Sequence, residues 1–124
     1  MSERLGWTLF MAAGVVVLVL LGLHMVTMHL DDLISVNNPA GGSAVDWANV
    51  VGRAKAVSTA VGYVLLLGAA LFHGLFGLRT ILFELSPAAG VKQVINVALT
   101  LAGCALFAYG TWAAWASYQM ALRA

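Results

Sequence analysis

Three long stretches of this chain contain no Asp, Glu, Lys or Arg, and they constrain its fold more than any other feature. They run from Leu5 to Leu30, from Ala56 to Leu78 and from Gln93 to Leu122. Each is longer than the roughly 20 apolar residues that a helix needs to cross a bilayer. Only 9% of the 124 residues are charged, against about 25% in a typical soluble domain. We therefore expect an all-α membrane protein whose three transmembrane helices form an up-down-up bundle.

We place the three spans at about residues 6–29, 57–85 and 91–120, within a single membrane-anchor domain of residues 1–124. The apolar core of a secretory signal is only about 7–15 residues long, so we expect the first span to be retained. The single cysteine, Cys104, rules out a disulfide within the chain and a cysteine pair for an iron–sulfur or zinc site.

The segment between the first two spans is the longest polar part of the chain. Its sequence Asn37-Asn38-Pro39-Ala40-Gly41-Gly42 is typical of a turn. After it, Ser43 is placed to cap a short helix over residues 44–55, whose valines and Trp47 would lie at the membrane surface. The alternative is a solvated loop anchored by one tryptophan, and the sequence leaves both open.

The third span carries two patterns that concern its packing. Gly103 and Gly110 are seven residues apart on one helix face, and small residues on one face favour close contact with a neighbouring helix. Aromatic residues gather in its second half, as expected near a membrane interface: Tyr109, Trp112, Trp115 and Tyr118.

The orientation of the spans is not decided by charge. Three spans place the ends of the chain on opposite sides, and the positive-inside rule compares the basic residues of the two sides. The two sides carry three each: Arg4, Arg79 and Lys92 on one, and Arg53, Lys55 and Arg123 on the other.

His73 lies inside the second span, where an ionisable residue is costly and usually functional. Small residues flank it on its helix face, and Glu84, eleven residues later, lies within about 20° of it and roughly 16 Å along the axis. This pattern predicts an axial haem ligand, with the acidic residue toward a quinone or proton. The alternative is a histidine that hydrogen-bonds a neighbouring helix. Arg79 points to another side, toward a haem propionate or a partner subunit.

The first span ends with two histidines that cannot face one site. His24 and His29 are five residues apart, or about 140° around a helix. We expect His29 to reach the interface, while His24 is a second candidate ligand or a packed histidine. His24 lies about 8 Å and His73 about 24 Å from the same side of the bilayer. Since the two ligands of one iron share a depth, each histidine would need a partner ligand from another chain.

The segment His73-x-x-x-Gly77-x-Arg79-x-x-x-x-Glu84 resembles the second helix of the membrane anchor subunits of succinate dehydrogenase and fumarate reductase. The resemblance implies that His73 ligates haem b iron, that Gly77 and Arg79 belong to the cofactor-binding set, and that Glu84 lies near the quinone. Glu84 stands where the family more often has Asp, and no Tyr follows it. His24 stands where the two-haem members hold their second haem.

The resemblance implies a haem b-binding anchor subunit of a prokaryotic succinate:quinone oxidoreductase, with one or two haems shared with a second anchor subunit. Such a subunit tethers the flavoprotein and iron–sulfur subunits and helps pass electrons to a quinone, for which we expect menaquinone. It has no flavin or iron–sulfur site of its own. It would lie in the cytoplasmic (inner) membrane with its N-terminus in the cytoplasm.

Two other functions stay open at this point. One is a cytochrome b-type anchor of another respiratory enzyme, such as a hydrogenase or a formate dehydrogenase, although such chains usually carry more spans and more histidines. The other is a small haem-free membrane scaffold protein. Nothing in the sequence indicates a nucleic-acid partner or a hydrolase site.

Overall fold

The computed structural model describes residues 3–30, 40–85 and 88–124, and in these segments the chain is helical without any strand. The four helices are α1 (Glu3–His29), α2 (Trp47–Ala54), α3 (Val57–Leu85) and α4 (Ala89–Arg123). The three long helices are sufficiently long and apolar to cross a membrane. The predicted all-α fold with three long apolar helices is confirmed.

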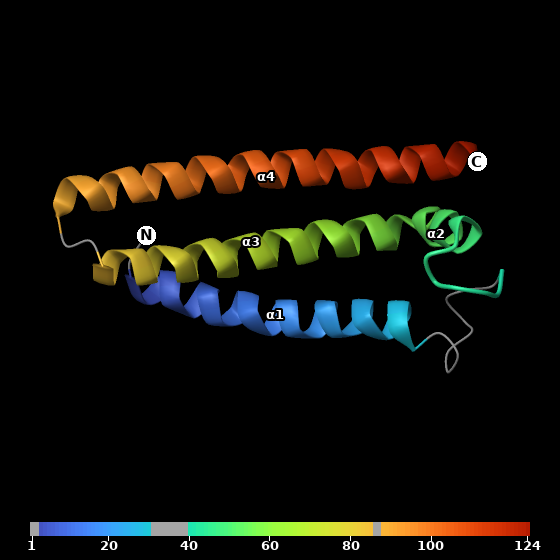
Figure 1. The fold of residues 1–124 in the computed structure, drawn as a ribbon, viewed down its shortest axis with the longest axis horizontal. Helices are drawn as coiled ribbons and strands as arrows, with labels where there is room; N and C mark the ends of the chain where they lie inside the picture. The colour runs from blue at the N-terminus through green and yellow to red at the C-terminus, as the bar shows by residue number, and fades with distance from the viewer. Residues whose placement is uncertain (1–2, 31–39, 86–87) are drawn as a thin grey trace.

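The three long helices lie in a row with α3 in the middle (Figure 1). α3 packs against both α1 and α4, and neighbouring helices run in opposite directions. The start of α1, the end of α3 and the start of α4 lie at one end, while α2 and the C-terminus lie at the other. The up-down-up order is therefore as predicted. Because the row is open, much of each helix faces outward, and large apolar side chains on all three long helices are exposed.

Glycines on α4 bring it close to α3, as the sequence predicts. A Cβ atom added to Gly103 would lie 2.8 Å from Cδ1 of Leu75, and one added to Gly110 would collide with Leu67. Here the leucines of α3 fill the space that the glycines of α4 leave, which is the close packing that small residues permit between membrane helices.

The polar segment after α1 contains a helix, so the helical alternative is confirmed, but its start differs from the prediction. α2 begins at Trp47, and its N-cap is Asp46 rather than Ser43. The Asp46 carboxylate instead accepts a hydrogen bond from the backbone N–H of Ser43, at 2.8 Å. Gly41 and Gly42 have φ values of 71° and 73°, which few other residues adopt. Residues 37–39 of the predicted turn lie outside the described segments.

Asn49 fastens this turn to α2. Its side chain is fully buried and forms three hydrogen bonds: Oδ1 accepts from the N–H of Ala40 at 3.2 Å, and Nδ2 donates to the carbonyls of Gly41 and Ser43 at 2.9 and 3.0 Å. Trp47, by contrast, is 77% exposed. The hydrogen bonds of Asn49 thus hold the turn against α2, while the side chain of Trp47 projects outward, as a tryptophan at a membrane surface would.

We expect Asn49→Ala to release this turn. The change leaves two backbone carbonyls and one N–H without their partner, at a cost of about 2 kcal/mol. Amide hydrogen exchange of residues 40–46 should therefore become faster, while α3 exchanges as before. Asn96→Ala, at the opposite end of the row, is the control and should leave this segment unchanged. Equal protection of residues 40–46 in both variants would contradict the role of Asn49.

We also expect Gly110→Val to loosen the packing of α4 on α3. The added side chain must displace Leu67, and overpacking of this kind costs about 1–3 kcal/mol. Thermal unfolding in detergent should show a lower midpoint than that of Gly74→Val, since a Cβ atom at Gly74 meets no atom of a neighbouring helix within 4 Å. Equal midpoints for the two variants would contradict close α3–α4 packing at Gly110.

Candidate functional site

His73 points from α3 onto the first half of α1. Its Nδ1 atom lies 3.0 Å from the backbone carbonyl oxygen of Phe10. Its ring stacks on the Phe10 ring, with centroids 4.2 Å apart and planes 5° from parallel. A Cβ atom at Gly14 would lie 2.9 Å from the Cε1 atom of His73. The imidazole therefore occupies space that exists because residue 14 has no side chain.

This contact assigns the proton of the imidazole. A carbonyl oxygen only accepts hydrogen bonds, so Nδ1 carries a hydrogen and donates it to the Phe10 oxygen, and in the neutral imidazole Nε2 is then the nitrogen with the lone pair. Nε2 has no hydrogen-bond partner in the described residues. It is also absent from their buried unpaired polar atoms, so it reaches the surface of the row. A histidine whose Nδ1 is held by a carbonyl and whose Nε2 is open has the form of a metal ligand.

Gly77 contributes to the same contact in a way that the sequence did not indicate. The resemblance placed it in the cofactor-binding set. In the structure a Cβ atom at Gly77 would lie 3.3 Å from Cε2 of Phe10. Gly77 thus makes room for the phenylalanine ring on which His73 stacks. Neither Phe10 nor Gly14 was identified from the sequence, because their role depends on how α1 is rotated against α3.

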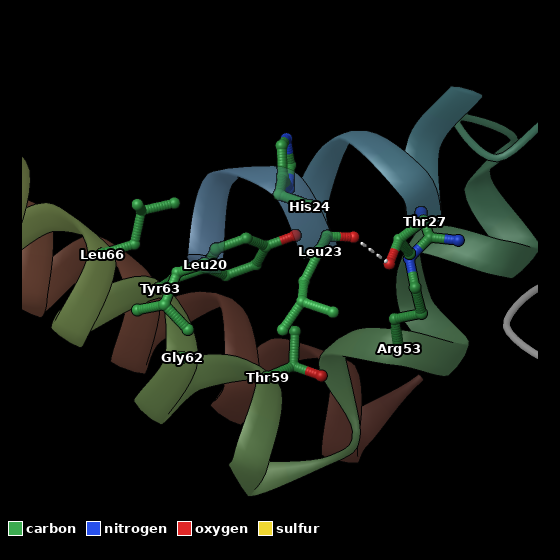
Figure 2. Close-up of a pocket in the computed structure, with 9 residues that line it drawn as sticks. All are labelled: Leu20, Leu23, His24, Thr27, Arg53, Thr59, Gly62, Tyr63 and Leu66. Atoms are coloured by element: carbon green, nitrogen blue, oxygen red, sulfur yellow. Dashed lines mark hydrogen bonds between the residues drawn. The ribbon is translucent and has the colours of Figure 1, made fainter. Parts of the chain in front are cut away.

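His24 lies in the second half of α1, next to Tyr63 of α3. The two rings meet edge to face, with centroids 5.9 Å apart. In Figure 2 the His24 ring stands at the edge of a cavity of about 260 Å³ and points away from Thr59 and Arg53. The cavity is lined by residues from α1, α2 and α3: Leu20, Leu23, His24, Thr27, Arg53, Thr59, Gly62, Tyr63 and Leu66. His24 has no hydrogen bond within the described residues and is half-buried.

The two histidines lie at different levels of the row. His73 faces Gly14 of α1, and His24 follows Gly14 by ten residues on the same helix. Ten residues of helix correspond to about 15 Å along the axis. The structure thus separates the two histidines as the sequence predicts. His29 is exposed at the last position of α1.

Arg79 is held on the side of α3 that faces α4. Its Nε atom donates a hydrogen bond of 2.6 Å to Oδ1 of Asn96, and its guanidinium lies 4.1 Å from the centroid of the Phe83 ring. It lines a cavity of about 700 Å³ near the start of α1. The lining residues come from all three long helices: Glu3, Gly6, Trp7, Phe72, Phe76, Arg79, Thr80, Phe83, Glu84, Asn96 and Thr100.

This cavity brings Arg79 and Glu84 to one place, although the sequence put them on different sides of α3. Asn96 and Trp7 were missed, because they belong to other helices. One signal was present within α3: Phe72, Phe76 and Phe83 follow helical spacing with Arg79 and form an aromatic wall. Glu3 joins Glu84 at the rim, and both carboxyl groups are exposed.

The described residues offer metal ions single imidazoles and no cluster of ligands. Among the residues with described positions, no three His, Cys, Asp or Glu side chains lie close enough to hold a metal ion together. A metal ion that needs several such side chains as ligands therefore has no site among these residues. A metal that brings most of its own ligands, and needs one nitrogen from the protein, suits His73.

Comparison with known proteins agrees with the resemblance seen in the sequence. The succinate dehydrogenase hydrophobic membrane anchor subunit of Archaeoglobus fulgidus is 29% identical over 110 residues, which cover 89% of this chain and 86% of the relative. No protein-family model and no solved structure matches the chain. The predicted resemblance to a succinate dehydrogenase anchor is confirmed, and with the three apolar helices it indicates a multi-pass membrane protein.

Proposed function

We propose that this chain is a membrane anchor subunit of a succinate dehydrogenase complex and that His73 is an axial ligand of haem b. The observation that carries the proposal is the placement of the His73 ring: Nδ1 is held by the Phe10 carbonyl, and Nε2 is accessible at the surface of the helix row. The similarity to an anchor subunit over most of the chain supports the first part.

The donor set fits a haem better than other iron sites. A porphyrin brings most of the iron ligands itself, so the protein would need to add only single side chains such as the imidazole of His73. This chain offers one histidine per level and no cluster of metal-binding side chains among its described residues. The other two histidines of this chain, His24 and His29, lie far from His73 along the helices, so a further histidine ligand would come from the second anchor subunit. Haem b, when bound, supplies a one-electron carrier inside the membrane.

His24 would ligate a second haem at the other level of the membrane. It is half-buried, and neither of its ring nitrogens has a hydrogen bond among the described residues. The separation of about 15 Å from His73 means that one iron cannot take both histidines. The two sites would therefore be independent, and each would need its own partner ligand.

The haem assignment is tested by the reduced-minus-oxidised absorbance of the complex, purified in mild detergent with its partner chains identified. We expect His73→Ala to lose at least half of the α-band absorbance per complex, because the iron loses one of its axial ligands. His24→Ala should remove half of it if two haems are present. His29→Ala is the matched control, since its exposed ring is expected to bind nothing.

An α band that is unchanged in His73→Ala would show that this histidine is not a haem ligand. The absence of any α band in the wild-type complex would favour a haem-free scaffold. Co-purification with hydrogenase or formate dehydrogenase subunits, instead of flavoprotein and iron–sulfur subunits, would favour an anchor of another respiratory enzyme.

We further propose that the cavity beside Arg79 receives the quinone headgroup. Its volume lies in the range of small-molecule sites, and its aromatic wall suits a flat ring. Asn96 holds Nε of Arg79, which leaves the other guanidinium hydrogens to donate to a quinone carbonyl. Glu3 and Glu84 at the rim would exchange protons with water. We retain menaquinone as the expected quinone and the cytoplasm as the side of this cavity.

We expect Asn96→Ala to raise the KM for quinone several-fold and to leave the haem content unchanged, because Arg79 loses the partner that orients it. Arg79→Gln should have a larger effect. Gln93→Ala is the control, since Gln93 is exposed on the same helix and does not line the cavity. Equal KM values for Asn96→Ala and Gln93→Ala would contradict a quinone site at Arg79.

A further inference from the structure

We propose that the first half of α1 is a seat for His73, in which the Phe10 carbonyl and Gly14 are positioning elements that set how strongly the imidazole binds iron. The proposal rests on His73 being the haem ligand, and it goes beyond that assignment by naming what tunes the ligand. The seat consists of three parts: the backbone carbonyl of Phe10, the ring of Phe10, and the open space at Gly14.

Gly14 makes the hydrogen bond possible. In an α-helix the carbonyl of residue 10 accepts from the N–H of residue 14, so residue 14 is the one that stands over that carbonyl. A Cβ atom there would lie 2.9 Å from Cε1 of His73, closer than real contacts permit, and 3.0 Å from Nδ1, tighter than most real contacts. With any larger residue at position 14 the imidazole would have to shift from its position at the Phe10 oxygen.

The Phe10 ring fixes the plane of the imidazole. The two rings are 5° from parallel with centroids 4.2 Å apart. The Phe10 ring is itself supported from α3, since it lies against Gly77 and is 5.7 Å from the ring of Phe76. Rotation of the imidazole would therefore require the Phe10 ring to move as well.

The seat has a chemical consequence. An imidazole that donates its Nδ1 hydrogen to a carbonyl is a more basic ligand through Nε2. A more basic ligand stabilises the oxidised iron and lowers its midpoint potential, and hydrogen bonds to an axial ligand are one of the means by which a protein tunes a haem. The orientation of the imidazole plane is read separately, in the low-spin electron paramagnetic resonance signal of the oxidised haem.

The test is Gly14→Ala in the purified complex, compared with Gly22→Ala. Both changes add one methyl group to α1, but a side chain at Gly22 meets no atom within 4 Å. We expect Gly14→Ala to raise the haem midpoint potential and shift the low-spin signal, because the methyl group pushes Nδ1 from the carbonyl. Gly22→Ala should keep both values of the wild type.

A second variant, Phe10→Leu, keeps the carbonyl and removes the stacked ring. We expect it to shift the low-spin signal while the midpoint potential stays closer to that of the wild type than in Gly14→Ala. If the Gly14→Ala complex fails to assemble, the low-spin signal of Phe10→Leu alone tests the proposal. An unchanged signal in Phe10→Leu would then show that α1 does not position the imidazole.

The failure of this inference differs from failure of the proposed function. If His73→Ala lowers the haem content while Gly14→Ala and Phe10→Leu keep the wild-type potential and signal, the seat is wrong and the ligand assignment stands. If His73→Ala keeps the full haem content, the assignment of His73 as ligand is wrong, and the proposed positioning role of α1 is wrong as well.

Discussion

The hydrogen bond between His73 and the Phe10 carbonyl is the interaction around which the α1–α3 pair is arranged. In a membrane the apolar side chains of two helices gain little by leaving lipid for each other, so close packing and interhelical polar contacts decide how helices pair. The pair meets both conditions at one level: Gly14 admits the imidazole, and Gly77 admits the ring of Phe10. The same contact orients the nitrogen that would bind iron.

The open row of helices explains why the candidate sites lie at the surface of the chain rather than in a core. α3 packs on both neighbours, yet few residues in the described parts of the chain are buried. Nε2 of His73 and the ring of His24 are accessible at two levels of the row. In the proposed function, the remaining haem ligands and much of the packing would come from partner subunits, as expected for an anchor subunit.

The two ends of the row differ in chemistry. At the start of α1, the large cavity combines an aromatic wall with Arg79, whose guanidinium is held by Asn96 and stacked on Phe83. At the other end, the turn fastened by Asn49 leads into α2, which packs on α3 and α4. One end therefore has a cavity with an aromatic wall and a fixed guanidinium, and the other has a short helix beside the smaller cavity of His24.

The sequence by itself determined the three long helices, their alternating directions and the separate levels of His24 and His73, because charge-free length and helical rise depend on the chain alone. It left the polar segment open between a helix and a loop, and it misplaced the N-cap of α2. Only the tertiary structure decided that Gly14 faces His73, that Gly77 faces Phe10 and that Asn96 holds Arg79. The long helices are apolar on all sides, so their pattern cannot fix how one is rotated against the next, and that rotation selects which residues meet.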